Sequence, residues 1–238
     1  MNSENIDPRL KIDFDRDWKS ILSQKLVDSG YSADTDRDTF QICIQYFNCL
    51  KRQIESKPRK VFISKELKCP DNHKKGLDII REKVTRGQDL TPHLSKLVKR
   101  NLNFNDSLLN DWGIYHFHLG DLLLTDGFMT RTGSLLFARI THDCFYMIDI
   151  FNHGDWCEKR IVETLHNNWK ESIELYTIKG VKMPSAWIST NNVVPYSRKH
   201  GISTFIQVSD GTIYCPAWWR LYNFQDFTRC SNYMQLLR

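Results

Sequence analysis

Three apolar segments near the middle of the chain decide the fold: Trp112-Gly-Ile-Tyr-His-Phe-His-Leu119, Ser134-Leu-Leu-Phe-Ala-Arg-Ile140 and Cys144-Phe-Tyr-Met-Ile-Asp-Ile-Phe151. The first alternates in polarity, and the other two are continuous apolar runs of the length that strands have. Only Thr141-His142-Asp143 separates the second segment from the third, which predicts a hairpin. We therefore expect an antiparallel meander over this part of the chain.

Helical patterns flank the meander on both sides. Apolar residues recur at helical spacing after Asp15 and again after Asp38, which predicts two helices that form a helical hairpin. Residues 60–63 predict a short strand, and residues 71–85 predict a helix. Another helix is expected after Asp155, so strands and helices should combine in an α+β fold.

The chain divides by these patterns into three parts. We expect an N-terminal helical extension at residues 1–57, an α+β core at residues 58–175 and a β-rich extension at residues 176–238. Within the last part, residues 203–208 and 212–215 predict a β-hairpin around Ser209-Asp210-Gly211.

The overall composition excludes several classes of protein. Of the 238 residues, 41% are hydrophobic and 26% are charged, which rules out collagen-like, low-complexity and wholly disordered chains. No apolar run approaches the ~18 residues that span a bilayer, and the N-terminus is rich in Asp rather than basic. We therefore expect a cytoplasmic protein without a membrane partner.

Motif searches narrow the chemistry further. The sequence contains no P-loop, no G-x-G-x-x-G after a strand, no HExxH and no G-x-S-x-G. Its seven Cys include no CxxC pair, which favours reduced, buried thiols over a disulfide framework or a zinc knuckle. We expect no cofactor and no structural metal.

Positive charge is concentrated in one segment. Residues 51–100 hold 15 Lys or Arg against 6 Asp or Glu, whereas the rest of the chain holds 18 against 22. Such a segment favours a polyanionic partner, and Lys96, Lys99 and Arg100 stand at the end of the segment that leads to the meander. The alternative is a solvated helical face that is merely rich in lysine.

Three histidines accompany the meander. His116 and His118 are two residues apart, so their side chains leave the same face of a strand, and His153 stands where the third strand ends. Arg131 lies just before the second strand, and Asp121 lies just after the first. The loop between these strands could bring both of them near the same rim.

Two chemistries suit these residue types. In RNA cleavage, one imidazole accepts the proton of a 2′-hydroxyl, another protonates the leaving 5′-oxygen, and an Arg stabilises the charge on phosphorus. Alternatively, His-x-His with a third His and an acidic group is a set of metal ligands. A third interpretation is that alternating His and aromatic residues simply line a half-buried sheet. The spacing does not distinguish these interpretations.

The order of elements resembles the RelE/ParE toxin superfamily over residues 60–155: a strand, a basic helical region and the meander, which ends in Phe151-Asn-His-Gly154. Members have a small curved antiparallel sheet packed on helices, and many are ribonucleases that cut mRNA, often in the ribosomal A site. The resemblance implies such a core here. It also implies functional roles for the positions that match the family pattern: His116, His118, Arg131 and His153.

Taken together, these patterns predict a toxin-like endoribonuclease of a toxin–antitoxin or phage-defence system that acts without metal. His116 or His118 would be the general base, His153 the general acid and Arg131 the clamp on phosphorus. The segment around Lys96, Lys99 and Arg100 would bind the RNA backbone.

The expected partners are RNA, with or without the ribosome, and an antitoxin or inhibitor protein. Two alternatives remain open. One is a metal-dependent hydrolase or nuclease that uses the His cluster. The other is a non-catalytic module that binds nucleic acid or protein.

Overall fold

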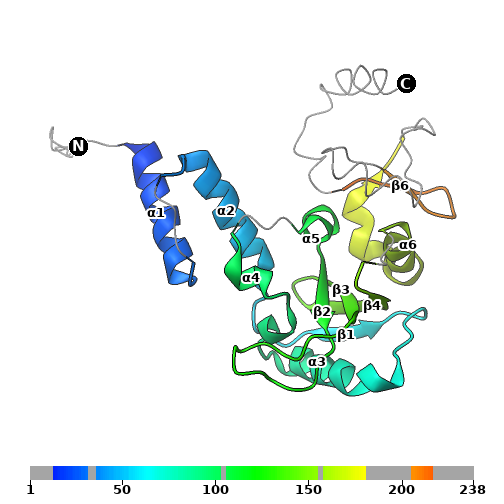
Figure 1. Cartoon of the computed structure of the whole chain (residues 1–238). Coiled ribbons are helices and arrows are strands. Elements are labelled where there is room, and N and C mark those ends of the chain that lie inside the picture. The colour runs from blue at the N-terminus through cyan, green and yellow to red at the C-terminus, as the bar shows by residue number, and fades with distance from the viewer. Residues whose placement is uncertain (1–12, 32–35, 103–105, 155–157, 181–204, 217–238) are drawn as a thin grey trace, which may run out of the picture. The chain divides into compact units, whose positions relative to one another are not determined.

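The computed structural model describes residues 13–31, 36–102, 106–154, 158–180 and 205–216 (Figure 1). The chain divides into two compact units, which we describe separately. The helical unit combines residues 1–53 with residues 96–105, and the sheet unit combines residues 54–95 with residues 106–238. Most of the extension expected at residues 176–238 lies outside the described residues.

Helices in the described residues are α1 (Phe14–Asp28), α2 (Thr39–Arg52), α3 (Lys74–Arg86), α4 (Leu97–Arg100), α5 (Ser107–Trp112) and α6 (Glu158–Trp169), with 3-10 turns η1 (Asp71–His73), η2 (Thr91–His93) and η3 (Lys170–Tyr176). Strands are β1 (Lys60–Ile63), β2 (Ile114–His118), β3 (Ser134–Ile140), β4 (Cys144–Asn152), β5 (Thr177–Ile178), β6 (Ile206–Gln207) and β7 (Ile213–Tyr214). In the part of the chain described here, no helix is long and apolar enough to cross a membrane.

In the helical unit, α1 and α2 lie side by side and run in the same direction. Near their N-terminal ends, Thr39 donates a hydrogen bond to Asp15 at 2.9 Å, and the Trp18 indole contacts Cys43 Sγ at 3.2 Å. The expectation of a helical hairpin is therefore wrong. Ten residues separate the two helices, and such a segment can extend about 35 Å, enough for the chain to return to its starting end.

Four apolar side chains form the centre of the helical unit: Leu22, Leu26, Ile42 and Cys49. Helix α4 belongs to the same unit, where Tyr31 donates a hydrogen bond to the carbonyl of Val98. Large apolar side chains on α1 and α2 also face solvent, and those of Phe14 and Phe40 are 81% and 74% exposed. Among the described residues of α1 and α2, large apolar side chains thus lie at the surface as well as in the core.

The sheet unit is built on four strands in the order β1-β4-β3-β2. Strands β2, β3 and β4 pair antiparallel, as the meander predicts, whereas β1 pairs parallel to β4. The sheet is therefore mixed, and the expectation of a wholly antiparallel sheet is wrong. A long connection that contains α3 links β1 to the meander, and it allows the edge strand to run in either direction.

Helices cover this sheet on both sides, which gives the α+β class (Figure 1). One face packs Ile114, Leu135 and Phe137 against α6, whose Ile161 and Leu165 are fully buried. Helix α3 lies on the opposite side of the sheet from α6 (Figure 1). The strands are thus held between two apolar layers, which fixes the face to which each side chain points.

Strands β5, β7 and β6 form a second, three-stranded sheet beside α6 and η3. Strands β6 and β7 pair antiparallel, and the chain turns between them at Ser209-Asp210-Gly211. His166 on α6 contacts the Tyr214 hydroxyl at 2.7 Å and Asp210 Oδ2 at 3.0 Å. These contacts tie the described part of the C-terminal extension to the sheet unit.

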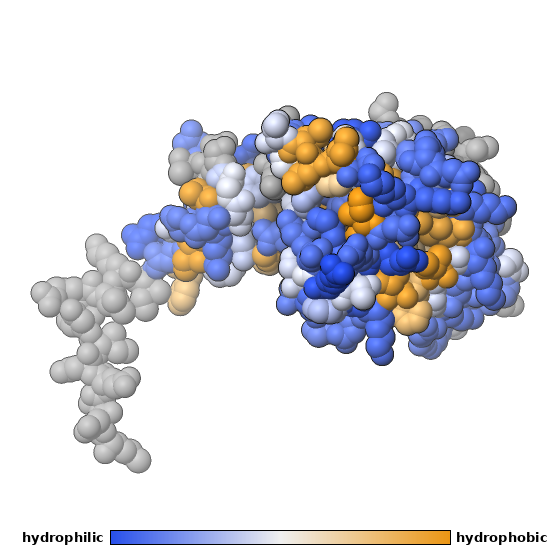
Figure 2. Space-filling view, turned by 90° about the horizontal axis from the view of Figure 1, so that it is seen from below, coloured by the Kyte–Doolittle hydropathy of each residue, from blue (hydrophilic) through white to orange (hydrophobic). Residues whose placement is uncertain are grey.

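The coloured part of the face seen in Figure 2 is largely hydrophilic. Seen from below the view of Figure 1, apolar residues gather in several patches between charged side chains (Figure 2). In the connection between β2 and β3, Leu122 and Leu123 are 60% and 65% exposed. The cysteines among the described residues are free thiols: Cys43, Cys49, Cys69, Cys144 and Cys215. Only Cys49 and Cys215 are buried, so the expectation of buried thiols holds for two of the five.

Candidate functional site

Strand β2 carries two of the predicted histidines on one face of the sheet. His116 pairs with Phe137 across to β3, and His118 pairs with Leu135. The strand has an unbroken register with β3, so residues two apart point to the same side. The ring of His116 lies 6.0 Å from that of Phe137, which places it beside the apolar core next to α6.

The other two predicted residues lie at the end of the sheet where β3 begins and β4 ends. His153 follows the last residue of β4, is exposed, and donates its backbone N–H to Gly133 at 2.7 Å. Arg131 precedes β3 and donates from Nη1 to the carbonyl of Leu94 at 2.8 Å. The first contact fixes the backbone of His153 at the strand end, and the second fixes the guanidinium of Arg131.

A close approach of the chain to itself fixes the loop between β2 and β3. Gly120 lies directly against Thr130, because a Cβ at Gly120 would be only 2.0 Å from the Thr130 carbonyl oxygen. Any side chain at Gly120 would push the two ends of the loop apart. Glycine at this position therefore helps to bring Arg131 near the end of β2.

The four predicted site residues lie within electrostatic reach of one another. Burial is the main cause that lowers the pKa of His116, and the charges of His153 and Arg131 lower it further. The pKa of His118 is lowered by burial and also by Arg131, His116 and His153. Hydrogen bonds show the same placement, because Thr132 and Gly133, which follow Arg131, bond to His118 Nδ1 and to the backbone N–H of His153. The predicted site residues therefore lie around one end of the sheet: His116, His118, Arg131 and His153.

His116 has a carboxylate neighbour that the sequence did not reveal. Asp106 Oδ2 lies 3.6 Å from His116 Nδ1, and both side chains are largely buried. Burial has the larger effect and lowers the pKa of His116, whereas this carboxylate partly offsets that effect by raising it. Asp106 directly precedes the short helix α5, so its sequence context is typical of a helix cap. No sequence pattern connects it with β2.

His118 differs from His116 in its hydrogen bonds. The backbone N–H of Thr132 donates to His118 Nδ1 at 3.2 Å, so the neutral ring carries its proton on Nε2. Burial and nearby cations lower its pKa to about 3. His118 is therefore a neutral imidazole at pH 7 that can donate a hydrogen bond from Nε2.

A further histidine, His93, forms a hydrogen bond with the backbone of β2. His93 in η2 is fully buried, and its Nδ1 donates to the carbonyl of His118 at 2.9 Å. Burial lowers the pKa of His93 to about 4. No sequence pattern indicates this role, because His93 lies in a short turn outside the meander and meets β2 only through tertiary packing.

The basic segment is divided between the two units. Lys96, Lys99 and Arg100 belong to the helical unit, whereas the four predicted site residues belong to the sheet unit. Within the sheet unit, α3 carries ion pairs at its surface: Lys74–Asp71, Lys75–Asp121, Arg81–Asp78 and Arg86–Glu82. Much of the positive charge on α3 is thus neutralised locally, as expected for a solvated helical face.

The predicted metal-ligand alternative has no matching geometry in the described part of the chain. There, no group of three or more His, Cys, Asp or Glu side chains is placed so that it could hold a metal ion. Asp121, which was a candidate acidic neighbour of Arg131, instead pairs with Lys75 at 2.9 Å.

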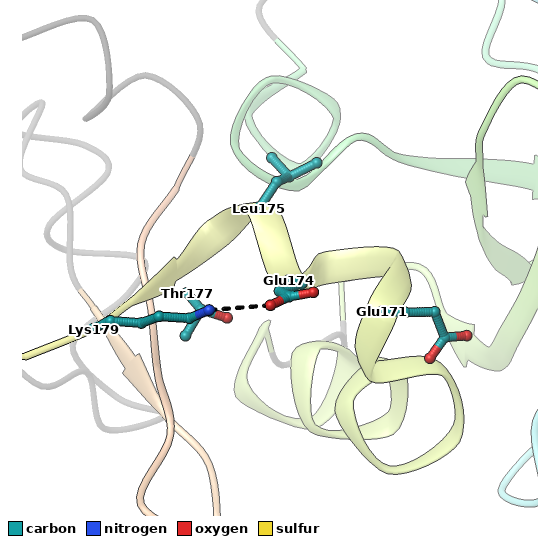
Figure 3. A pocket seen from close by; sticks show the side chains of 5 residues that line it. All are labelled: Glu171, Glu174, Leu175, Thr177 and Lys179. Carbon is teal, nitrogen blue, oxygen red and sulfur yellow. Dashed lines mark hydrogen bonds and ion pairs between the residues drawn. The ribbon is translucent and has the colours of Figure 1, made fainter.

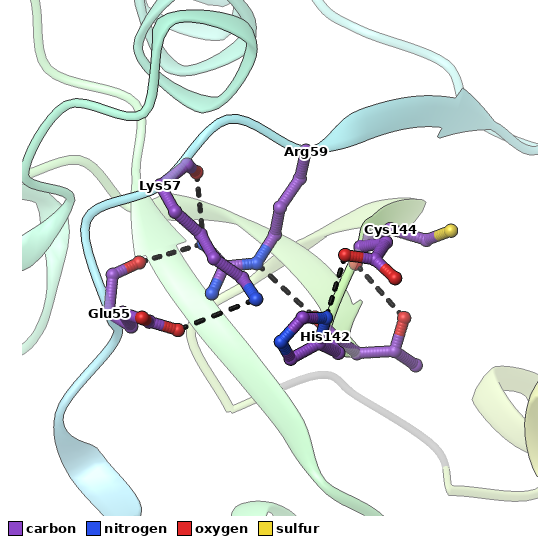
Figure 4. Close-up of polar contacts among 7 residues, drawn as sticks. Glu55, Lys57, Arg59, His142 and Cys144 are labelled. Atoms are coloured by element: carbon purple, nitrogen blue, oxygen red, sulfur yellow. Dashed lines mark hydrogen bonds and ion pairs between the residues drawn. The ribbon is translucent and has the colours of Figure 1, made fainter.

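A second group of polar contacts surrounds the turn between β3 and β4 (Figure 4). His142 Nδ1 lies 2.7 Å from Asp143 Oδ1, and both side chains are exposed. Arg59 donates to the carbonyls of Thr141 and Glu55 at 3.2 and 2.8 Å. These contacts tie the start of β1 to the turn.

An open hollow lies at the surface of η3 and β5. Glu171, Glu174, Leu175, Thr177 and Lys179 line it, and the Lys179 ammonium pairs with Glu174 at 3.1 Å (Figure 3). None of the predicted site residues is among these five. The hollow is therefore separate from the histidine group.

Comparisons of the chain with protein-family models, curated proteins and solved structures found no match.

Proposed function

We propose that this chain is a toxin-like endoribonuclease that cleaves RNA by acid–base catalysis without metal. The observation that carries the proposal is the placement of His116, His118, Arg131 and His153 around one end of the sheet, where Thr132 bonds to His118 and Gly133 to the backbone of His153. Two imidazoles and a guanidinium are the groups that this reaction needs. The relation to RelE/ParE toxins is part of the same proposal, in which the sheet unit holds the toxin-like core.

Hydrogen bonding separates the roles of the two histidines on β2. Nδ1 of His118 already accepts the Thr132 N–H, so His118 is assigned as a neutral donor toward a phosphoryl oxygen. His116 is assigned as the general base. Its lowered pKa keeps the ring neutral, and so able to accept a proton, at pH 7.

The proposed reaction is an in-line transfer at phosphorus. His116 takes the proton of the 2′-hydroxyl while the 2′-oxygen forms a bond to phosphorus. The bond from phosphorus to the 5′-oxygen breaks, and His153 gives a proton to that oxygen. Arg131 stabilises the charge that develops on the phosphoryl oxygens. The products are a 2′,3′-cyclic phosphate and a 5′-hydroxyl.

The partners in this proposal are RNA, free or on the ribosome, and an antitoxin or inhibitor protein that controls the activity. Lys96, Lys99 and Arg100 of the helical unit are assigned to the RNA backbone. Contacts of this kind predict that RNA affinity falls steeply as salt rises. Replacing all three by Gln should weaken binding without changing the nature of the products.

The experiment is RNA cleavage by the full chain in excess chelator, with and without ribosomes. We expect cleavage by the wild type, and a loss of about 100-fold or more in His153→Ala and in Arg131→Ala. His142→Ala is the matched control, because it removes an exposed imidazole at the far turn.

Each alternative has its own outcome in this assay. Cleavage that appears only with added divalent metal would favour a metal-dependent nuclease. Salt-sensitive RNA binding with no products under any ion condition would favour a non-catalytic binding module. Full activity in both variants would refute the assignment of His153 and Arg131.

A further inference from the structure

The carboxylate of Asp106 is held in place by two elements at once. Its Oδ1 accepts the backbone N–H of Leu109 at 3.1 Å and so caps α5, while Oδ2 lies 3.6 Å from His116 Nδ1. The Asp106 and His116 side chains are only 15% and 17% exposed. Because it caps α5 and is largely buried, the Asp106 carboxylate has little freedom to move away from the His116 ring.

The groups around His116 act on it in opposite directions. Asp106 on the α5 side favours the protonated ring, whereas Arg131 before β3 and His153 after β4 disfavour it. His118, the neighbour on the same strand, also interacts with it. Among these groups, Asp106 alone is an acceptor with no hydrogen to donate. The side of His116 that faces Asp106 should therefore carry a proton.

We propose that Asp106 is the positioning residue of the His116 base, and that it holds the imidazole with its proton on Nδ1 so that Nε2 accepts the proton of the 2′-hydroxyl. This inference rests on the proposed ribonuclease function. It adds a group from outside the meander to the site, and it assigns opposite tautomers to two histidines on one strand. His118 carries its proton on Nε2, because Nδ1 accepts from Thr132.

The test is Asp106→Asn in the full chain, with Asp78→Asn as the matched control. Asn caps helices as well as Asp does, so the variant keeps the cap and removes the charge. Asp78 is an exposed residue of α3 that pairs with Arg81, and its replacement makes the same chemical change away from His116. Nitrogen-15 NMR of the imidazoles at pH 7 measures which nitrogen carries the proton.

We expect the fraction of His116 with its proton on Nδ1 to fall in Asp106→Asn and to stay constant in Asp78→Asn. The acid limb of the profile of kcat/KM against pH should move to lower pH, because the variant loses a charge that raises the pKa of the base. The value of kcat/KM at pH 7 should fall about 10- to 100-fold. A merely structural role for the cap would change neither the tautomer nor the acid limb.

The result that overturns the inference is an unchanged His116 tautomer in Asp106→Asn. This outcome is distinguishable from failure of the proposed function, because the NMR signals do not depend on cleavage. If the wild type does not cleave RNA, the ribonuclease proposal fails and Asp106 has no base to position. If it cleaves RNA and the tautomer is unchanged, the failure belongs to Asp106 alone.

Discussion

The sheet unit places a histidine beside an aspartate in two regions, and the closer pair is the more exposed to solvent. At the β3–β4 turn, His142 and Asp143 are 2.7 Å apart, but their side chains are 82% and 76% exposed. Beside β2, His116 and Asp106 are 3.6 Å apart and largely buried. Water screens the first pair, whereas the second lies in a region of low dielectric beside two more titratable groups and an Arg.

Distance alone therefore does not determine how strongly a carboxylate acts on an imidazole. Burial sets how strongly neighbouring charges act on an imidazole, and hence whether its protonation differs from that of a free histidine. The pKa of His116 is lowered by its surroundings, mainly by burial. If burial matters in this way, substitutions beside β2 should affect RNA cleavage much more than substitutions at the exposed β3–β4 turn.

The largest effect is expected from removing the proposed base. His116→Ala should lower kcat/KM for RNA cleavage by about 100- to 10,000-fold, because general base catalysis contributes that much to such reactions. The same change at His142 should leave kcat/KM within about twofold. Steady-state kinetics on one RNA substrate measures both. Equal losses of kcat/KM in His116→Ala and His142→Ala would show that the buried and the exposed histidine do not differ in function.

A smaller loss is expected at His118. In His118→Asn, the side-chain oxygen can still accept the Thr132 N–H, while the donor at Nε2 is lost. We expect kcat/KM to fall about 10- to 100-fold, with the acid limb of the pH profile unchanged, because the base is still present. If the acid limb moves, His118 rather than His116 takes the proton of the 2′-hydroxyl.

Acid should weaken the folded state through the buried histidines. The pKa of His93 is lowered to about 4 and that of His118 to about 3, against about 6.5 when unfolded. Below pH 6.5 the unfolded chain binds protons that the folded chain does not. The free energy of unfolding should therefore fall by about 1.4 kcal/mol per pH unit for each ring, down to its folded pKa.

Denaturant unfolding between pH 7 and pH 4.5 measures this loss. His93→Asn retains a donor for the His118 carbonyl and cannot titrate, so its stability should depend less steeply on pH. His142→Asn is the exposed counterpart and should leave the slope unchanged. Identical slopes in wild type and His93→Asn would show that His93 titrates normally in the folded protein.

The smallest effect on activity is expected at Arg59, which supports the exposed region. Its guanidinium donates to the carbonyls of Thr141, Glu55 and Lys57 (Figure 4). Arg59→Ala should lower the free energy of unfolding by about 1 to 2 kcal/mol and leave kcat/KM within about twofold. Thermal unfolding and the cleavage assay measure the two quantities. A large loss of activity at constant stability would place the turn region in the site.

Local patterning was sufficient to predict the four strands of the main sheet, but not the short strand β5. The alternation before Leu119 and the two apolar runs correspond to β2, β3 and β4, and residues 60–63 correspond to β1. Each of these signals depends on residues close together in sequence. The direction in which elements pair depends instead on residues far apart in sequence. A connection of about fifty residues sets the direction of β1 against β4, and the segment that precedes α2 sets the direction of α2.

Prediction of the candidate site was limited for the same reason. Period-two spacing placed His116 and His118 on one face, and strand ends placed Arg131 and His153. Asp106 and His93 come from a helix cap and a short turn whose sequences carry only local signals. Their meeting with β2 depends on tertiary packing, which spacing along the chain does not encode.

The most direct measurement of the central claim is the chemistry of the RNA ends. The full chain is incubated with RNA in excess chelator, and the termini are identified by mass spectrometry, with His116→Ala as the control. We expect 2′,3′-cyclic phosphate and 5′-hydroxyl ends from the wild type, and neither with His116→Ala. Intact RNA, or 5′-phosphate ends that form only with added metal, would contradict this expectation.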